Sequence, residues 1–391
     1  MAVFDWLNVP AAQMASSPLW HPVEKALYWS DPIACRIYRY NPSEGTTQVV
    51  LEDGRPVGAM TLQADGSLLL FRDQANIVVF RDGAVAETII NGIADFRQTC
   101  FVSAAADKSG RVVCAVSSDS HHTGRLLLLE RNGHLSLLED GFSVPAGLSF
   151  TPDGEALYFN DSHETRQTTW QYKYDSTNEN PIKEAPFTYH CGFAEARSWL
   201  GYPSGIAVGQ DGSLWISRRD GAMVVRHNGP GEPTESVRLA VRKPLGICFG
   251  GENLTDLFVT TGGGHRKPLE GLHAGEVAAI HGVGPGVLPF ASRIRLSDDV
   301  EDVISACVAE KTAAVELDST VVEQEPVATE ELKEPSVEEP KSEELLSSVE
   351  DKPSSDAVTD AAVSETVAAV EPQPTLFQPP TKPSAGGFVS L

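Results

Sequence analysis

Short apolar runs that alternate with polar positions recur along the chain, and tight turns separate them. Residues 145–162 read PAGLSFTPDGEALYFNDS. Leu148 and Phe150 alternate with polar positions before a Pro-Asp-Gly turn, and Leu157 and Phe159 resume the alternation after it. Pro presets one turn dihedral, and Gly accepts a positive φ that other residues resist. The pattern therefore predicts a strand, a turn and a second strand.

Variants of this unit repeat at a nearly constant interval. The equivalent turn residues are Glu24, Asp65, Ser109, Asp153, Asp211 and Glu252. Their numbers differ by 41, 44, 44, 58 and 41 residues in turn. A period of about 40–50 residues with several short strands per unit is typical of a β-propeller. We therefore predict an all-β fold, a six-bladed propeller that occupies residues 1–300.

The composition changes near residue 301. From there to residue 391 the chain carries 20 acidic and 5 basic residues, and prolines are frequent. Such a stretch cannot bury enough apolar surface to offset its ordering entropy, so 301–391 is expected to be a disordered acidic tail. Residues 375–391, TLFQPPTKPSAGGFVSL, regain apolar side chains and lose the acidic charge. They are either the end of a spacer or a docking peptide for a partner protein.

Charge and cysteine usage exclude several classes of function. The net charge of −24 leaves no basic surface for a phosphate backbone, so nucleic acid is not an expected partner. No run approaches 18 apolar residues, so no membrane span is expected. The start of the chain lacks the pattern of a secretory signal, and the six cysteines are widely spaced. A cytoplasmic protein with reduced thiols is the expectation.

Three blocks resemble one family of propellers. They are SPLWHPVEKALYWSDPIACRIYRY from residue 17, GLSFTPDGEALYFNDS from residue 147, and PSGIAVGQDGSLWISRRDGAMVVR from residue 203, followed by KPLGICFGGENLTDLFVT. Together they are similar to the regucalcin (senescence marker protein)/gluconolactonase family, over roughly residues 10–290. The resemblance implies a six-bladed propeller and hydrolysis of sugar lactones. It also implies one divalent cation, Ca²⁺ or Zn²⁺ among others, in the central channel.

The positions that hold this cation in the family have changed here. By resemblance they carry Glu, Asn and Asp, and in this chain they are Ser16, Ala146 and Ser204. A hard dication is held chiefly by oxygen ligands, and its affinity follows the number of charged ones. Two hydroxyls and a methyl group leave no negative charge at the site. We therefore expect no metal cofactor at this place, and no hydrolysis by the family's metal-dependent route.

The neighbouring substrate motif of the family, Arg-x-Asn-Asp-Gly, is also altered. Arg97 is kept, whereas Thr99 and Cys100 stand in place of Asn and Asp. Arg97 and Thr99 are the candidate substrate-binding residues, because a guanidinium can clamp a carboxylate or a phosphate in a bidentate way. The alternative is that Arg97 forms an ion pair that stabilises a blade.

Other chemistry would need other residues. His121, His122, His190 and Cys191 are candidate ligands of a relocated metal, with ordinary loop histidines as the alternative. Ser16 or Ser204 with one of these histidines would make a nucleophile–base pair.

Three further polar or glycine-rich positions have simpler interpretations. Asp31 and Asp161 are expected to cap turns and hold blades together. The stretch 262–264, Gly-Gly-Gly, has no Walker lysine and no following helix pattern, so we expect a flexible loop.

Two hypotheses for the function remain. In the first, the protein is a divergent, non-catalytic or repurposed propeller that binds a partner protein or a small polar ligand, such as a sugar lactone or an organic acid. In the second, it is a sugar-lactone or ester hydrolase that uses a relocated metal or a metal-free site.

Overall fold

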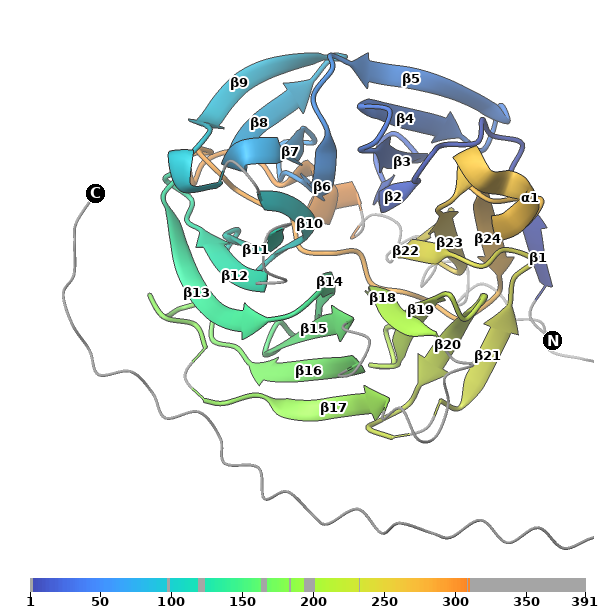
Figure 1. The fold of residues 1–391 in the computed structure, drawn as a ribbon. Coiled ribbons are helices and arrows are strands. Elements are labelled where there is room, and N and C mark those ends of the chain that lie inside the picture. Colours follow the sequence, from blue (N-terminus) through green and yellow to red (C-terminus); the bar gives the residue numbers. More distant parts are fainter. Residues whose placement is uncertain are drawn as a thin grey trace, which may run out of the picture. The chain divides into compact units, whose positions relative to one another are not determined.

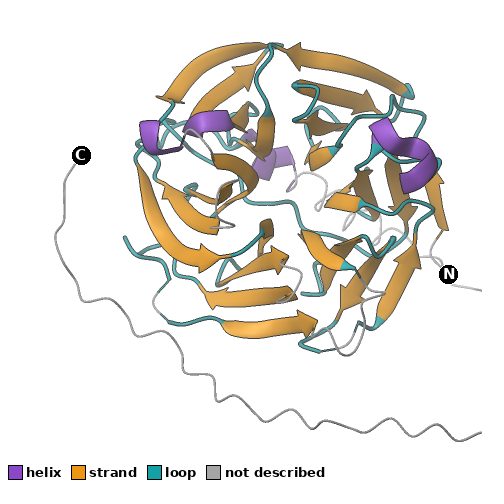
Figure 2. Cartoon of the chain, in the orientation of Figure 1, coloured by secondary structure: helices purple, strands orange, loops and turns teal. Residues whose placement is uncertain are grey.

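The structure is a computed structural model of the 391-residue chain, and it describes residues 3–96, 99–118, 124–162, 167–182, 184–192, 201–231, 233–307 and 309. The described residues form six four-stranded antiparallel sheets arranged as blades around a central axis (Figure 1). Helices occur in this part of the chain only as short segments (Figure 2). The six-bladed propeller predicted from the repeat is confirmed.

The first three blades follow the chain from the axis outward. Blade 1 comprises β2 (Ser16–His21), β3 (Ala26–Asp31), β4 (Arg36–Asn41) and β5 (Thr46–Glu52). Blade 2 comprises β6 (Val57–Leu62), β7 (Leu68–Arg72), β8 (Asn76–Arg81) and β9 (Ala84–Asn91). Blade 3 comprises β10 (Thr99–Ala106), β11 (Val112–Ser118), β12 (Gly124–Leu129) and β13 (Leu135–Phe142).

The remaining blades complete the ring. Blade 4 comprises β14 (Pro145–Phe150), β15 (Ala156–Ser162), β16 (Gln167–Lys173) and β17 (Phe187–Gly192). Blade 5 comprises β18 (Tyr202–Val208), β19 (Leu214–Arg219), β20 (Met223–His227) and β21 (Glu235–Arg238). Blade 6 comprises β22 (Pro244–Gly250), β23 (Asp256–Thr261), β24 (Val277–His281) and β1 (Val3–Trp6).

Blade 6 closes the ring with strands from both ends of the propeller. The N-terminal strand β1 pairs antiparallel with β24, from Val3 opposite His281 to Trp6 opposite Ala278. The ring of Trp6 also stacks on the imidazole of His273, with 4.6 Å between centroids. Closure by hydrogen bonds leaves no open edge between the first and last repeats.

Apolar side chains from neighbouring blades pack against each other. One cluster joins Phe71 of blade 2 to Phe101 and Leu127 of blade 3. The next joins Leu126 of blade 3 to Phe159 of blade 4. Leu126 and Leu127 are adjacent in β12 yet belong to different clusters, because successive strand residues point to opposite faces of a sheet and both faces of this blade are buried.

Every inner strand contains a β-bulge, in which it has one more residue than the strand that it pairs with. The bulges lie at Ser16/Leu19 in β2, Val57/Ala59 in β6, Phe101/Ser103 in β10, Pro145/Leu148 in β14, Pro203/Ile206 in β18 and Pro244/Ile247 in β22. Four bulges contain a glycine, at Gly58, Gly147, Gly205 and Gly246, because the next inner strand approaches closely. A Cβ on Gly147 would lie 2.4 Å from the carbonyl oxygen of Ser204, and one on Gly205 would lie 2.6 Å from that of Leu245.

A segment after β24, residues 285–295, crosses one end of the central channel; we call it the strap (Figure 1, orange). Its backbone N–H groups donate to the inner ends of three blades. Val287 donates to the carbonyl of Val208 (3.1 Å), Ser292 to that of Leu62 (2.8 Å) and Arg293 to that of Gly110 (2.8 Å). The periodic pattern of the blades does not continue into the strap, so the strap was not predicted.

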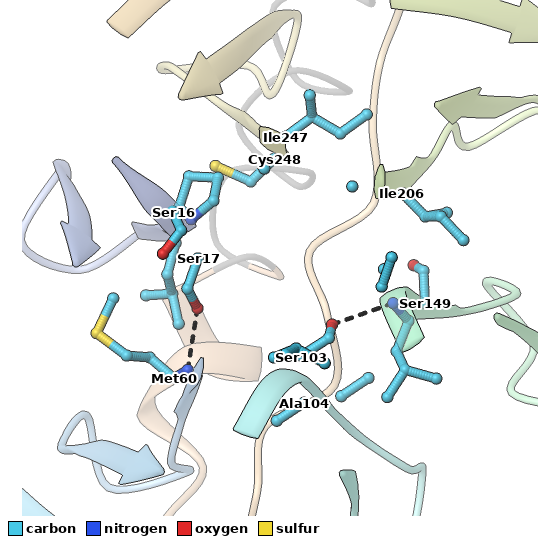
Figure 3. Close-up of a pocket in the computed structure, with 18 of the residues that line it drawn as sticks. Ser16, Ser17, Met60, Ser103, Ala104, Ser149, Ile206, Ile247 and Cys248 are labelled. Atoms are coloured by element: carbon cyan, nitrogen blue, oxygen red, sulfur yellow. Dashed lines mark hydrogen bonds between the residues drawn. The ribbon is translucent and has the colours of Figure 1, made fainter. Parts of the chain in front are cut away.

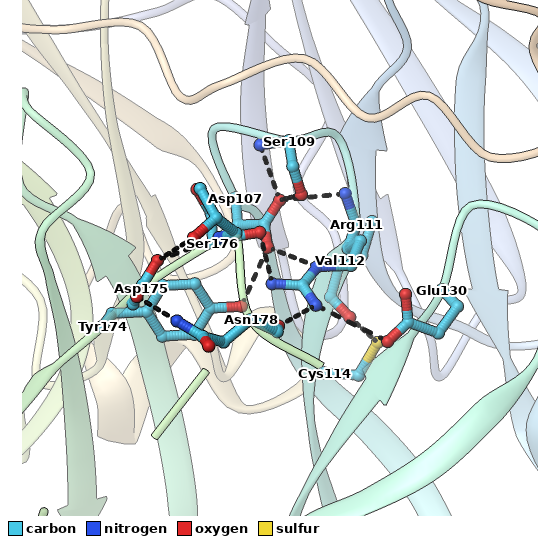
Figure 4. Close-up of polar contacts among 11 residues, drawn as sticks. Asp107, Ser109, Arg111, Val112, Cys114, Glu130, Tyr174, Asp175, Ser176 and Asn178 are labelled. Atoms are coloured by element: carbon cyan, nitrogen blue, oxygen red, sulfur yellow. Dashed lines mark hydrogen bonds and ion pairs between the residues drawn. The ribbon is translucent and has the colours of Figure 1, made fainter. Parts of the chain in front are cut away.

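A buried polar network ties blade 3 to blade 4 (Figure 4). The carboxylate of Asp107 is fully buried, and it accepts hydrogen bonds from Arg111 Nε (2.9 Å) and from the Tyr174 hydroxyl (3.0 Å). Arg111 also donates to the carbonyls of Ser176 (2.9 Å) and Asn178 (2.8 Å). Burial, and then the charge of Asp107, raise the pKa of Tyr174 far above its usual value. The tyrosine therefore stays a neutral donor.

The two strand-end aspartates hold blades together, as expected. Asp31 accepts hydrogen bonds from the backbone N–H groups of Gln13 (2.6 Å) and Met14 (3.3 Å). Asp161 accepts one from the N–H of Val144 (2.8 Å). Each carboxylate therefore binds the backbone of the segment that precedes the inner strand of its own blade.

The expectation of a flexible glycine loop at 262–264 is wrong. Gly262 donates its backbone N–H to the carbonyl of Lys243 (2.9 Å), and two short helices follow directly: η4 (Gly264–Arg266) and α1 (Lys267–Glu270). A proline in the first turn of α1 and the Lys243–Glu270 ion pair (2.8 Å) support this short helix, which was too short to show a periodic pattern.

The packed chain extends a few residues past the boundary expected at residue 300. Residues 303–307 are helical, and Ile304 is buried in the cluster of Leu19 and Leu70. Residues 310–391, which hold most of the predicted tail, lie outside the described residues.

The described cysteines, namely Cys35, Cys100, Cys114, Cys248 and Cys307, form no disulfide. No helix within the described ranges is long and apolar enough to cross a membrane.

Candidate ligand-binding channel

The inner strands of all six blades surround a cavity of about 620 Å³ on the propeller axis. Figure 3 shows side chains from β2, β6, β10, β14, β18 and β22 converging on this space. Strap residues 287–290 line the cavity too. Its volume falls in the range of about 300–1,000 Å³ that is typical of small-molecule sites.

The three positions that the resemblance assigns to metal ligands all line this one cavity. Ser16 lies at the start of β2, Ala146 in β14 and Ser204 in β18. Positions far apart in the sequence thus converge on the axis, as the resemblance implied. The Ser16 hydroxyl lies 3.2 Å from that of Ser30, and the carbonyl of Ser204 accepts a hydrogen bond from Asn160 Nδ2 (2.7 Å).

Charged groups are scarce along the channel. Among the described residues that line it, Asp73 and Arg219 alone carry a charged side chain. Asp73 is paired with Arg55, with 2.9 Å between Oδ1 and Nη2, and the Arg219 guanidinium lies 5.2 Å from the ring centroid of Tyr202. Within the described ranges no group of three or more His, Cys, Asp or Glu side chains could hold a metal ion. The donor set at Ser16, Ala146 and Ser204 does not fit a hard dication.

Two of the channel serines have a structural task. Ser17 Oγ accepts a hydrogen bond from the backbone N–H of Met60 (3.0 Å), and Ser103 Oγ accepts one from that of Leu148 (3.1 Å) (Figure 3). Each of these bonds joins the inner strands of two adjacent blades. The other hydroxyl side chains among the described residues that line the cavity are Ser16, Thr61, Ser149, Thr151, Ser162 and Ser204.

One of the two candidate substrate residues, Thr99, is the first residue of β10. Arg97 lies outside the described residues. Thr99 donates its hydroxyl to the carbonyl of Phe96 (2.9 Å), while the next residue, Cys100, lines the cavity. A role of Arg97 and Thr99 in binding substrate stays a prediction.

The relocated-metal alternative rests on residues of which little is described. His121 and His122 lie outside the described residues, as do the side chains of His190 and Cys191. The backbone of the latter pair belongs to β17, the outermost strand of blade 4. Three inter-strand spacings separate β17 from β14, about 14 Å. This placement does not favour a site that His190 and Cys191 share with the channel.

Residues 14–263 match the family described as the SMP-30/Gluconolactonase/LRE-like region. The chain belongs to this family. The fold and the site geometry described above agree with the resemblance seen in the sequence, and that recognition is confirmed.

Relatives in the SMP-30/gluconolactonase family include characterised lactonases. The pentonolactonase XacC of Haloferax volcanii is 32% identical over 255 residues, which cover 65% of this chain and 83% of the relative. Human regucalcin is 24% identical over 298 residues, covering 70% of this chain and 93% of regucalcin. The chain is thus a propeller of the sugar-lactone hydrolase type.

Solved structures show the same fold. A luciferin-regenerating enzyme superposes with a TM-score of 0.65 at 21% identity, over 76% of this chain and all of that one. A regucalcin from Agrobacterium tumefaciens, described as a calcium-binding protein, superposes with a TM-score of 0.63 at 16% identity, over 75% and 97% of the two chains.

Sequence reasoning missed most of the apolar channel lining. Met60, Ile206, Ile247 and Cys248 line the wall, and strap residues 287–290 line one end. The wall residues follow the bulges of their strands, so aligning the six repeats on the bulge would have found them. The strap has no equivalent in the repeat and gave no such signal.

Proposed function

We propose that this member of the SMP-30/gluconolactonase family binds a small molecule in its central channel and does not hydrolyse it by a metal-dependent route. One observation carries the proposal: Ser16, Ala146 and Ser204 line one cavity and bring no charged oxygen to it. In a metal-dependent lactonase the cation polarises the lactone carbonyl and acidifies a water molecule. Two hydroxyls and a methyl group supply neither effect.

The channel retains what binding requires. It is enclosed by inner strands whose axial edges carry backbone N–H and C=O groups, and it offers hydroxyls at Ser16, Ser149 and Ser204. Neutral groups of this kind orient a ligand by hydrogen bonds. The described lining has no acid–base pair positioned for proton transfer, since Asp73 is engaged by Arg55.

Metal content and turnover test the proposal directly. The purified, undialysed protein is analysed by mass spectrometry for divalent metals, next to a sample treated with EDTA. Hydrolysis of D-glucono-1,5-lactone is followed for both samples. We expect no stoichiometric cation and no enzymatic turnover in either sample. Turnover that EDTA abolishes and a divalent cation restores would contradict the proposal.

The alternative is a sugar-lactone or ester hydrolase with a relocated metal or a metal-free site. The identity of 32% with a pentonolactonase supports it. A stoichiometric cation in the untreated protein would favour this alternative, and His121 and His122 would then be the first residues to replace. Turnover without any metal would instead direct attention to Ser16 and Ser204.

A further proposal concerns the C-terminal region and rests on the sequence alone. Residues 301–391 would act as an acidic tether, and residues 375–391 would dock to a partner protein. Removal of 375–391 is then expected to leave the melting temperature of the propeller unchanged and to abolish co-purification of that partner. Unchanged co-purification after the truncation would argue against docking through this segment.

A further inference from the structure

We infer that the ligand of the channel is an uncharged molecule whose deeply buried part is apolar. Its alkyl or aryl portion lies toward the strap, and an oxygen-bearing group lies at the level of Ser16 and Ser204. The inference rests on the proposed function, because it specifies the ligand of that same channel.

The direction of the inner strands places a polar level and an apolar level in the channel. Ser16, Ala146 and Ser204 lie in the first three residues of their strands. The strap contacts the opposite ends: Val287 donates to the carbonyl of Val208, the last residue of β18, and Phe290 forms a bridge with Ala106, the last residue of β10. Four residues separate Ser204 from Val208, so the two levels are about 13 Å apart.

The level near the strap is largely apolar. Ser149 and two threonines add hydroxyls there, but the Thr61 hydroxyl is hydrogen-bonded to Ser292 Oγ (3.1 Å) and that of Thr151 donates to Asp153 Oδ1 (2.6 Å). The cavity is lined there by Phe150, Val208 and Phe249 from the strand ends, together with strap residues 287–290, Val-Leu-Pro-Phe. None of these side chains can form a hydrogen bond. An apolar group that leaves water for this end of the channel gains the free energy of burial, about 25 cal/mol per Å².

The wall between the two levels is neutral. Met60, Ile206, Ile247 and Cys248 line it, from three of the blades (Figure 3). Burial raises the pKa of the Cys248 thiol well above its usual value, so this group carries no charge. The wall adds dispersion contacts and polarisable sulfur atoms without adding a charged partner.

This lining disfavours an anion or a fully hydroxylated sugar. A carboxylate or phosphate that moved past Ser204 would lose its hydration, and no described residue of the wall or the strap end offers a cation. Each buried hydroxyl of a sugar would likewise need a partner, whereas the deep part of the channel supplies few. An uncharged lactone, ester, ketone or alcohol with an alkyl or aryl group would bury neither a charge nor several unpaired hydroxyls.

Calorimetric titration of the EDTA-treated full-length protein tests this inference with two probes, one uncharged and partly apolar and the other charged and polar. γ-Nonalactone presents an uncharged ring oxygen and a pentyl chain, and D-gluconate presents an anion with hydroxyls. We expect saturable binding of γ-nonalactone, at least about tenfold tighter than that of D-gluconate. Equal or tighter binding of D-gluconate, or the lack of saturable γ-nonalactone binding, would overturn the inference.

A pair of isosteric variants locates the binding in the channel. Ser204→Asp adds a charge at the polar level, and Ser204→Asn adds nearly the same volume without charge. The Asp variant is expected to weaken γ-nonalactone binding at least about tenfold relative to the Asn variant. Val49→Asp, on the exposed outer strand β5, is the control and should bind like the unmodified protein. Equal binding by both Ser204 variants, each with a preserved melting transition, would overturn the inference.

A separate assay tests the proposed function. The same samples are assayed for hydrolysis of γ-nonalactone before and after addition of divalent cations. Metal-dependent turnover would overturn the non-hydrolytic function, while the titration still decides which ligand class the channel accepts.

Discussion

The side-chain oxygen of Ser103 accepts a hydrogen bond from the backbone N–H of Leu148 at 3.1 Å, and so joins the inner strands of blades 3 and 4. Ser17 does the same for Met60 between blades 1 and 2, at 3.0 Å. Where the equivalent bulge position is a glycine, as at Gly147 and Gly205, adjacent backbones come close enough that no side chain fits. Serine and glycine are thus two solutions for the same contact around the axis.

Replacing Ser103 with Ala should destabilise the propeller modestly. The Leu148 N–H would lose its acceptor, which costs about 1 kcal/mol in the free energy of unfolding. Urea denaturation measures the change. The control is Ser236→Ala on the exposed outer strand β21, where a change within about 0.5 kcal/mol is expected. Equal effects of the two variants would show that the Ser103 bond contributes nothing.

Replacing Asp107 with Asn should cost far more. The carboxylate is fully buried and the Arg111 side chain is 7% exposed. Loss of the negative charge leaves the guanidinium with only the more distant and more exposed carboxylate of Glu130, at 3.6 Å. We expect a loss of about 3 kcal/mol in the free energy of unfolding. Lys173→Gln, which breaks the exposed Lys173–Glu184 pair, is the control and should cost less than about 1 kcal/mol. A comparable loss in both variants would contradict the importance of burial.

Restoring charged ligands should create a cation site. The triple variant Ser16→Glu, Ala146→Asn and Ser204→Asp is expected to bind about one divalent cation per chain, because two carboxylates and an amide then face one cavity. Titration against a chromophoric chelator measures binding. The matched control, Ser16→Gln, Ala146→Asn and Ser204→Asn, has nearly the same volume without the charges and should not bind. If the charged variant binds no better than the control, the positional correspondence with the family is wrong.

Acid should weaken the closure of blade 6 through Glu276. Burial opposes ionisation of this carboxyl group, but hydrogen bonds from Lys267 and His273 outweigh it and lower its pKa. A carboxyl group with a depressed pKa in the folded state stabilises the fold fully above its unfolded pKa of about 4.3, and this contribution is lost as the pH falls below that value.

Glu276→Gln removes that contribution. The melting temperature of the variant should depend less on pH than that of the unmodified protein over about pH 5 to 3, and the two should differ most near neutral pH. Glu44→Gln, in an exposed turn, serves as the control and should preserve the slope. An unchanged slope in the Glu276 variant would refute the assignment.

The repeat unit made the fold predictable from the sequence. Turn residues such as Asp65 and Asp211 recur at a regular interval, and each accepts local hydrogen bonds that fix its turn. Local signals of this kind are visible in a sequence. By contrast, β1 pairs with a strand more than 270 residues away, and the strap pairs with three blades in turn. Neither contact leaves a local pattern, so neither was predicted.

The site was predictable in part for a related reason. Ser16, Ala146 and Ser204 hold equivalent places in their repeats, so the family pattern located them, and the structure places all three at one cavity. The apolar character of the channel depends on Phe249 and on strap residues 287–290, which come from the end of blade 6 and beyond. The family motifs do not extend to the strap, and only the three-dimensional arrangement brings it to the axis.

In β14 and β18, the residues within the bulge and the residues just after it take part in different contacts. Residues just after a bulge, such as Leu148 and Ile206, pack in the hydrophobic clusters that hold the ring, whereas Ala146 and Ser204 within the bulges belong to none of those clusters. A mutation at Ala146 or Ser204 therefore alters what the axis presents without removing a side chain from those clusters. The packing of the ring and the chemistry of the axis therefore depend on different residues in these two strands, and one can vary without the other.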